Sequence, residues 1–130
     1  MLELHGNIFN CGCLTCSFES PTLDFYEKNK SEVDMLCPSC LVGLIKVKTI
    51  SFGQSLDQNI LSIAHQVSAK AKNFIVMGSS LKVSPANSFI KVAKANKAKI
   101  IILNKDKTPF DDYADIVIND DLENIYEQIK

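Results

Sequence analysis

Two pairs of cysteines constrain this chain of 130 residues more than any other feature. Cys13 and Cys16 form one Cys-x-x-Cys pair, and Cys37 and Cys40 form a second pair after an interval of 20 residues. A two-residue gap lets both thiolates of a pair reach one metal ion, and two pairs complete the four-sulfur shell of a structural zinc site. We therefore predict a structural zinc ion, with no coordination position left for water. Unrelated buried cysteines or a redox pair are the alternatives, and Cys11 is expected to lie outside the shell.

The composition is that of a globular protein, with 46% hydrophobic and 22% charged residues, so the chain should fold as one domain with a small insert. The 14 basic residues nearly balance the 15 acidic ones, and no basic run predicts a nucleic-acid partner. The apolar runs are too short to span a bilayer. We expect a cytoplasmic protein without a membrane partner, in which the cysteines are ligands or free thiols.

Residue composition and hydrophobic pattern change along the sequence and divide the chain into three parts. Residues 1–10 read as a short strand leading into a His5-Gly6 turn, where an imidazole could act as a general base or could be purely structural. Residues 11–46 hold every cysteine and predict a small zinc-binding module. Residues 47–130 alternate β-rich and helical segments, which is typical of βα units and a parallel sheet. The predicted fold class is α/β: half of a Rossmann-like parallel sheet with helices, plus a small four-cysteine zinc-ribbon module.

Three helices are expected in the last part. Residues 55–72 place apolar side chains at helical spacing and predict one buried face: Ile60, Ile63, Ala64, Val67 and Ala71. In the second helix, Ser84 is expected to cap the N-terminus, Pro85 to take the first helical position, and Asn96 to end the helix. Residues 120–130 predict a third helix. Between them, the runs NFIVM, AKIIILN and ADIVI are continuous apolar segments, which suit parallel strands covered on both faces.

The turns after two of these strands carry small or polar residues. Gly78, Ser79 and Ser80 follow the first strand, where a ligand could approach the backbone and hydroxyls could bind phosphate or ribose oxygens, or where the loop could be an ordinary turn. Asn104 ends the next strand, where its amide could bond a ribose diol or could cap the turn.

Taken together, these residues resemble the sirtuin family of NAD-dependent protein deacylases. The resemblance covers nearly the whole chain and keeps the order of its elements: ELHG, the four cysteines, TISFGQ, GSSLKVSPA and ILNKDKTPFDDYADIVI. It implies that the chain corresponds to the C-terminal portion of the catalytic domain, from the ELHG stretch onward.

The resemblance also implies roles for individual positions. His5 falls on the catalytic histidine, the four cysteines on the structural zinc ligands, and Asn104 on the residue that binds the adenosine ribose of NAD. Gly78, Ser79 and Ser80 match the loop that contacts the NAD phosphates and ribose. The acyl-lysine peptide would be clamped as an added strand between two segments, whose matching residues here are Ile50, Phe52, Gly53, Leu81 and Val83.

The chemistry implied by the resemblance gives His5 its task. The acyl oxygen attacks the nicotinamide ribose, nicotinamide leaves, and a ribose hydroxyl must then lose a proton. An imidazole, with an ordinary pKa of about 6.5, is suited to accept a proton at neutral pH. Many sirtuins have Arg-Pro or Lys-Pro and a later Glu where this chain has Lys46-Val47 and Gln54, which leaves the preferred acyl group open.

Complete sirtuins also carry a glycine-rich turn and a Gln-Asn-Ile-Asp stretch before the ELHG stretch, and neither occurs in this sequence. We therefore expect a fragment that has no deacylase activity alone. If it belongs to an enzyme, it comes either from a truncated reading frame or from a split enzyme whose N-terminal half is a separate chain. A non-catalytic binding module or remnant is the alternative. An uncovered apolar sheet face is expected where the first strands and helices would pack.

Overall fold

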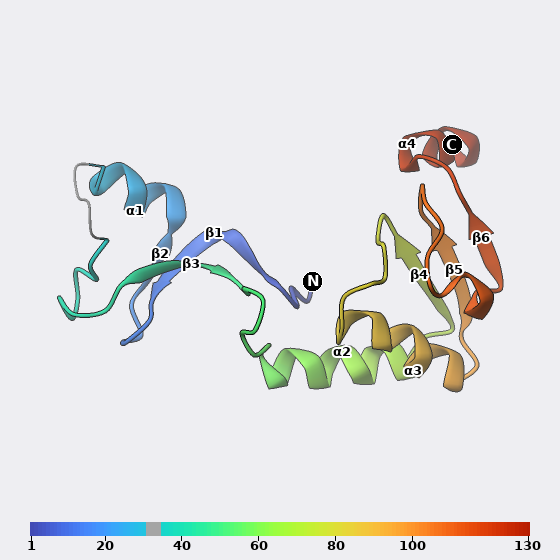
Figure 1. Ribbon diagram of the computed structural model, residues 1–130, viewed down its shortest axis with the longest axis horizontal. Helices are drawn as coiled ribbons and strands as arrows, with labels where there is room; N and C mark the ends of the chain where they lie inside the picture. Colours follow the sequence, from blue (N-terminus) through green and yellow to red (C-terminus); the bar gives the residue numbers. More distant parts are fainter. Residues whose placement is uncertain (31–34) are drawn as a thin grey trace. The chain divides into compact units, whose positions relative to one another are not determined.

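The computed structural model describes residues 1–30 and 35–130, which form two compact units, Met1–Asp57 and Gln58–Lys130 (Figure 1). This division falls later than the one expected after residue 46, because strand β3 (Ile45–Thr49) pairs with a strand of the first unit. Part of the expected zinc module, residues 31–34, lies outside the described residues. No helix in the described ranges is long and apolar enough to cross a membrane.

The first unit is built on an antiparallel sheet with the strand order β2-β1-β3. Strand β1 spans Gly6–Cys13 and β2 spans Glu19–Pro21, and helix α1 (Thr22–Lys28) follows β2 directly. Phe25 of α1 is buried and meets Phe18 edge to face, with ring centroids 6.3 Å apart. Among the described residues of this unit, the buried apolar side chains are Phe25 and two cysteines, Cys11 and Cys37. So small a core needs a further constraint such as a metal ion.

The strand expected before the His5-Gly6 turn lies after it instead. The N–H of Gly6 donates to the carbonyl of Glu3 at 3.0 Å and closes the turn, and β1 begins at Gly6 itself. Gly6 has a φ of +68°, which an L side chain adopts only at a cost. This backbone geometry explains why the turn precedes the strand.

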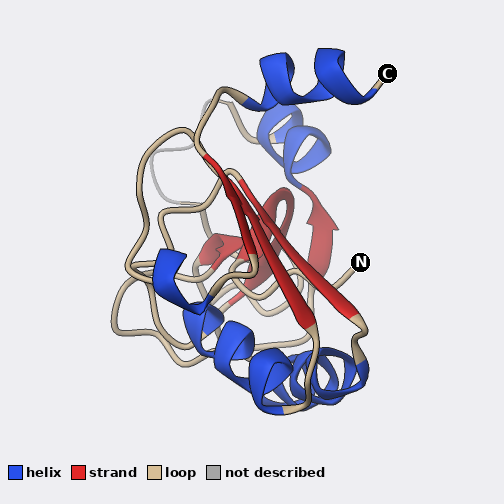
Figure 2. Cartoon of the chain, turned by 90° about the vertical axis from the view of Figure 1, so that its right-hand side faces the viewer, coloured by secondary structure: helices blue, strands red, loops and turns tan. Residues whose placement is uncertain are grey.

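The second unit contains a parallel sheet with the order β4-β5-β6, formed by Asn73–Met77, Lys99–Leu103 and Ile116–Ile118. Helices α2 (Gln58–Lys70), α3 (Phe89–Ala95) and α4 (Leu122–Ile129) are joined to these strands, with short 3-10 turns at Ala86–Ser88 and Asp111–Tyr113. Figure 2 shows the strands of this sheet side by side. The α/β class with a half Rossmann-like sheet is therefore confirmed.

The core of this unit lies on one face of the sheet. Val76, Ile100 and Ile102 point to this face and are buried together with Ile90 and Ala93 of α3. Helix α3 packs on β5, and α2 packs on α3.

Two expectations about the helices were wrong. Helix α3 begins at Phe89, so Ser84 does not cap it and Pro85 is not its first residue, although Asn96 does end it. On α2 the predicted stripe is only partly buried: Ala64 is buried, but Ile63 and Val67 are exposed.

Candidate functional site

The four cysteines of the two pairs lie together in the first unit. Their sulfur atoms all lie within 4.8 Å of one another, with 3.7 Å between Cys13 and Cys40 and 3.6 Å between Cys16 and Cys37. A tetrahedral shell with zinc–sulfur bonds of ~2.3 Å has sulfur–sulfur edges of about 3.8 Å. The four predicted ligands are therefore brought together in an arrangement that fits a structural zinc ion. Cys11 lies outside the cluster, and its thiol donates to the carbonyl of Ser20 at 3.4 Å.

Backbone N–H groups donate to the sulfurs and favour ionisation of two of the thiols, Cys13 and Cys40. Desolvation opposes ionisation of Cys13, but the N–H groups of Thr15 and Cys16 donate to its sulfur at 3.3 and 3.4 Å and lower its pKa. The N–H of Gly43 donates to the Cys40 sulfur at 3.3 Å and, with that of Val42, lowers the pKa of Cys40 to about 6. These donors favour the thiolate form that a zinc ion requires.

Cys16 has the opposite tendency. The N–H of Phe18 favours its thiolate, but desolvation and the neighbouring thiols of Cys37, Cys13 and Cys40 outweigh that bond and raise the pKa to about 12. Four neighbouring thiolates repel one another, so the thiols do not all ionise easily. A divalent cation among the sulfurs offsets this repulsion and stabilises the thiolate forms.

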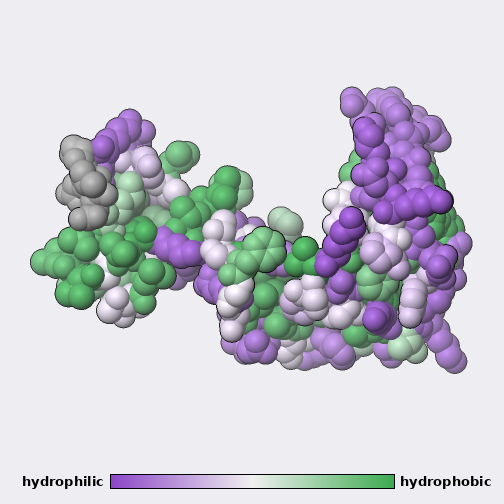
Figure 3. Space-filling model, in the orientation of Figure 1, coloured by the Kyte–Doolittle hydropathy of each residue, from purple (hydrophilic) through white to green (hydrophobic). Residues whose placement is uncertain are grey.

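Gly43 is a structural requirement of the cluster that the sequence reasoning missed. A Cβ atom at this position would lie 2.4 Å from the Cys13 sulfur and 2.6 Å from the Thr15 hydroxyl oxygen. The signal was available, since Gly43 follows the second cysteine of the second pair by three residues. The loops around the cluster also expose aliphatic side chains, which Figure 3 shows as a green area over this module; they include Leu14, Leu41, Val42 and Leu44.

His5 lies in the turn before β1, and its backbone is joined to the end of β3. The N–H of Ile50 donates to the carbonyl of His5 at 2.9 Å. A Cβ atom on Gly6 would lie 1.8 Å from the carbonyl oxygen of Lys48, so only glycine fits where β3 crosses the turn. The structure thus brings the candidate base and the first residue of one candidate peptide segment side by side.

The loop after Ile50 carries the other two candidate peptide residues of this unit. Phe52 is 99% exposed, and Gly53 has a φ of +83° with open space around it. Gln54 closes the turn: its N–H donates to the carbonyl of Ser51 at 3.0 Å, and its side-chain oxygen accepts from the N–H of Ser51 at 3.2 Å. The Lys46 ammonium donates to the carbonyls of Val47 and Thr49 and ties down the end of β3.

Gly78 and Asn104 lie in the second unit, where β4 and β5 end. The N–H of Gly78 donates to the carbonyl of Leu103 at 3.0 Å, and Gly78 has a φ of +60°. The Asn104 amide donates to the carbonyl of Asp106 at 2.7 Å, so it does cap its own turn. Asn119, after β6, donates to the carbonyl of Asn104 at 3.1 Å and was not anticipated. Ligands of open α/β sheets bind at this carboxyl edge.

The loop after Gly78 is held by its own side chains. The Ser79 hydroxyl accepts from the N–H of Leu81 at 3.3 Å, and the Asn87 amide donates to the carbonyl of Leu81 at 3.1 Å. Leu81 is buried with a φ of +54°, whereas Ser80 and Val83 are exposed. The roles proposed for these residues in NAD and peptide binding remain predictions.

The chain combines a four-cysteine module that fits zinc with a Rossmann-like sheet that has glycine and asparagine at its carboxyl edge. These features define a class of α/β proteins with a structural zinc site and a sheet of the nucleotide-binding type. Within that class, a family model described as the Sir2 family matches residues 1–85. The chain belongs to the Sir2 family, as its resemblance predicted.

Curated relatives agree with this assignment. The NAD-dependent protein deacetylase of Shouchella clausii is 46% identical over 121 residues, which are 92% of this chain and 48% of the relative. That of Oceanobacillus iheyensis is 40% identical over 118 residues, which are 91% of this chain and 47% of the relative. The chain spans about half the length of the curated relatives it matches.

Solved structures are similar as well. A Sir2 complex with a p53 peptide and NAD+ matches with a TM-score of 0.92 and 34% identity, over 98% of this chain and 53% of that one. Sir2 bound to an acetylated peptide matches with a TM-score of 0.93 and 33% identity, over 98% of this chain and 53% of that one.

Proposed function

We propose that this chain supplies the zinc module, the catalytic base and part of the NAD site of a sirtuin-type protein lysine deacylase. The observation that carries the proposal is the similarity to a Sir2 complex with peptide and NAD+ over 98% of this chain. The deacetylase names of the curated relatives support the same reaction.

In this proposal His5 is the general base. Its backbone is fixed by the Ile50 N–H bond and by the Gly6 turn, so the imidazole is carried on a well-defined turn next to a segment that would bind the acyl-lysine peptide. A base held in this way accepts a proton from a substrate hydroxyl when that hydroxyl lies within hydrogen-bond reach.

The carboxyl edge of the parallel sheet would hold part of the NAD. NAD supplies an activated ribose that accepts the acyl group. Gly78 presents backbone without a side chain, Ser79 and Ser80 add hydroxyls, and the Asn104 side chain is fixed at the edge by its bond to Asp106. Each fits a polar nucleotide ligand, and none depends on the zinc ion, which stays structural.

The substrate would be an acyl-lysine protein or peptide. Ile50, Phe52 and Gly53 in the first unit, and Leu81 and Val83 in the second, are the candidate contacts. The exposed Phe52 and the open Gly53 backbone suit a loop that pairs with an extended peptide through main-chain bonds. We further propose a cytoplasmic location, with neither nucleic acid nor membrane as a partner.

The remaining half of the NAD site would come from sirtuin sequence that carries the glycine-rich turn. The proposal therefore predicts no deacetylation by this chain alone and activity with a complementing sirtuin half. A binding module without catalysis is the competing function, and zinc binding by itself is compatible with both.

The test is NAD-dependent deacetylation of an acetyl-lysine peptide by this chain, alone and co-expressed with the complementing half. We expect activity only in the second case, and a loss of roughly 100-fold or more in His5→Ala, since general bases contribute that much. His65→Ala is the matched control, because His65 is exposed on α2, and it should retain activity. Zinc-loaded protein that is inactive in both cases would favour the binding module.

A further inference from the structure

A pocket of about 320 Å³ lies beside strand β3 in the first unit and reaches the loop that carries the candidate peptide residues. Its lining includes Gly12 of β1, Lys46 and Lys48 of β3, and Ile50 and Gln54 of the loop that follows β3. A volume of this size lies at the lower end of the range for ligand pockets. It has room for one side chain of a bound peptide.

Glycine and lysine side chains give this pocket its shape. Lys46 and Lys48 point to the same face of β3, because they are two residues apart on a strand. The register pairs Lys46 with Gly12, so the residue opposite has no side chain. The stem of Lys48 passes over Gly12, since a Cβ atom there would lie 3.4 Å from the Lys48 Cε atom. The glycine therefore leaves open the space that the pocket occupies.

The Lys46 ammonium is held beside the start of the peptide loop. It donates to the carbonyl of Val47 at 3.3 Å and to the carbonyl of Thr49, the residue before Ile50. Both acceptors are neutral, and none of the ion pairs found among the described residues involves Lys46. An ammonium group has three N–H donors. Lys46 therefore keeps its charge and one donor for a further acceptor.

The other charged groups leave a positive balance in the lining. The Lys48 ammonium pairs with the carboxylate of Glu19 on β2. Asp57 also lines the pocket, so two ammonium groups face one carboxylate there. Gln54 contributes an uncharged amide at the position where many sirtuins have glutamate, and a second carboxylate at this position would cancel the balance. The pocket is thus suited to a ligand with a single negative charge.

We propose that this pocket selects acyl-lysine substrates with an aspartate or glutamate close to the modified lysine, whose carboxylate pairs with the Lys46 ammonium. This inference rests on the proposed function and narrows its substrate class. A peptide that adds as a strand beside Ile50–Gly53 binds through its main chain, and pockets for its alternate side chains provide specificity. β3 leads directly into that segment (Figure 1), so a side chain near the acyl-lysine can reach the pocket.

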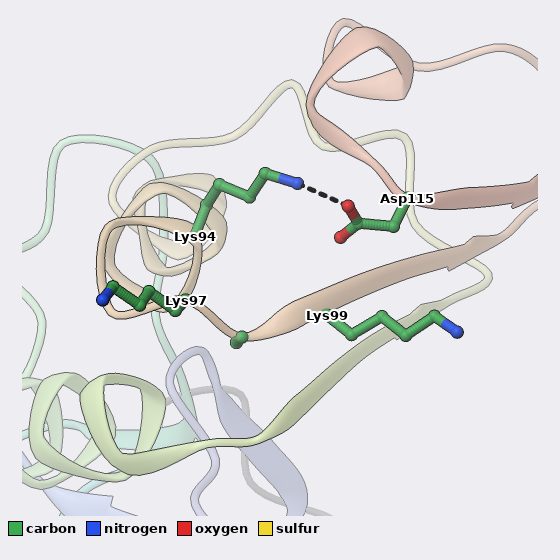
Figure 4. A pocket seen from close by; sticks show the side chains of 5 residues that line it. Lys94, Lys97, Lys99 and Asp115 are labelled. Atoms are coloured by element: carbon green, nitrogen blue, oxygen red, sulfur yellow. Dashed lines mark hydrogen bonds and ion pairs between the residues drawn. The ribbon is translucent and has the colours of Figure 1, made fainter.

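The lysine-lined pocket beside Asp115, in the second unit, does not have this arrangement. The Lys94 ammonium is neutralised by Asp115 at 2.8 Å, and Figure 4 shows Lys97 and Lys99 pointing away from that ion pair. Their charges therefore do not converge on one ligand.

The experiment compares pairs of acetyl-lysine peptides, in which one peptide has glutamate and the other glutamine at a position within two residues of the acetyl-lysine. Binding to the full chain is measured by fluorescence anisotropy, and deacetylation is measured with the full chain co-expressed with the complementing sirtuin half. The pocket variants are Lys46→Gln, Lys46→Arg and Gln54→Glu. The matched control is Lys28→Gln, which removes the same charge from α1 of the same unit.

We expect the glutamate peptide of at least one pair to bind and react better than its glutamine partner by roughly 3- to 10-fold, the range between an exposed ion pair and a buried charged hydrogen bond. Lys46→Gln should abolish this preference and Gln54→Glu should weaken it, whereas Lys46→Arg and the control should retain it. Because the readout is a ratio between two peptides, a general loss of stability or activity does not imitate the effect. The same preference in Lys46→Gln as in the native chain, or no preference in any pair, would overturn the proposal.

The two measurements separate this inference from the proposed function. Binding that prefers glutamate without any deacetylation would support the pocket and contradict the proposed function. Equal deacetylation of both peptides in every pair would contradict the pocket and support the function. Neither binding nor deacetylation of any peptide would overturn both.

Discussion

Replacing Gly43 by alanine should weaken zinc binding while leaving the backbone conformation allowed. The added Cβ would lie 2.4 Å from the Cys13 sulfur, whereas ordinary contacts begin at 3.4 Å. The sulfur would have to retreat by about 1 Å, which exceeds the ~0.2 Å tolerance of a zinc–ligand distance. The added methyl group could not move away from the sulfur instead, because the Thr15 hydroxyl oxygen lies 2.6 Å from the same Cβ.

Overpacking of this kind costs about 1–3 kcal/mol. At about 1.4 kcal/mol per tenfold change, the zinc affinity should fall by roughly 5- to 150-fold. The assay is competition for zinc against a chromogenic chelator, with the metal content of the purified protein as a second readout.

Gly12→Ala is the matched control, since Gly12 lies on β1 in the same unit and its nearest neighbours to a new Cβ are 3.4 Å away. It should hold zinc as the native chain does. Equal zinc affinity in the two alanine variants would refute the steric reasoning and would mean that the Cys13 sulfur is not fixed where the structure has it.

Three further predictions concern the turn before β1, the core and an ion pair. Gly6→Ala should cost at least the ~1–2 kcal/mol of left-handed backbone and speed hydrogen exchange at the Ile50 amide, which is bonded to the turn; unchanged exchange would contradict it. Ile102→Ala, at a fully buried position, should lower the free energy of unfolding by about 2–5 kcal/mol in chemical denaturation, and the exposed Met77→Ala much less. Asp115 has a lowered pKa because a lysine ammonium and a backbone N–H donate to its carboxylate. The stability that this carboxylate gives the folded chain is therefore present above its usual pKa and is lost as the pH falls through the lowered value. The melting temperature of Asp115→Asn should therefore lie below that of the native chain at pH 7 and approach it in acid; a constant difference would refute this assignment.

The zinc site could be predicted from the sequence because its information is local. Two cysteines separated by two residues already lie close together, so only the approach of the two pairs to each other depends on the fold. A bound zinc ion stabilises that approach. Gly43 was missed because its importance depends on the Cys13 sulfur, which is thirty residues away along the chain.

The start of α3 could not be predicted for a similar reason. Ser84-Pro85 has the residue types of a helix start, but the Asn87 amide donates to the carbonyl of Leu81, and the Ser88 hydroxyl donates to the carbonyl of Pro85. These side-chain bonds close a turn before the helix begins. They leave no periodic signal in the sequence, unlike the alternation of strands and helices.

The α2 stripe shows what hydrophobic periodicity does and does not report. The spacing of Ile63, Ala64 and Val67 predicts an apolar face, and the face is there, but of these three residues only Ala64 is buried. Periodicity records which side of a helix suits burial. It does not record whether every residue on that side is covered.

The strands of the second unit extend that argument. A strand with one face in water alternates apolar and polar residues, whereas NFIVM and KIIIL are apolar at nearly every position. Aliphatic side chains on the exposed face of this sheet, such as Ile75 and Met77, contribute little to a sheet that leaves them in solvent, and they raise the risk of aggregation. The same residues stabilise a sheet that is covered on both sides. The strand sequences are therefore those of a sheet with two buried faces, of which α3 covers one. The pocket of about 360 Å³ beside Asp115 (Figure 4) is different in kind, because lysines line it and no apolar strand pattern points to it.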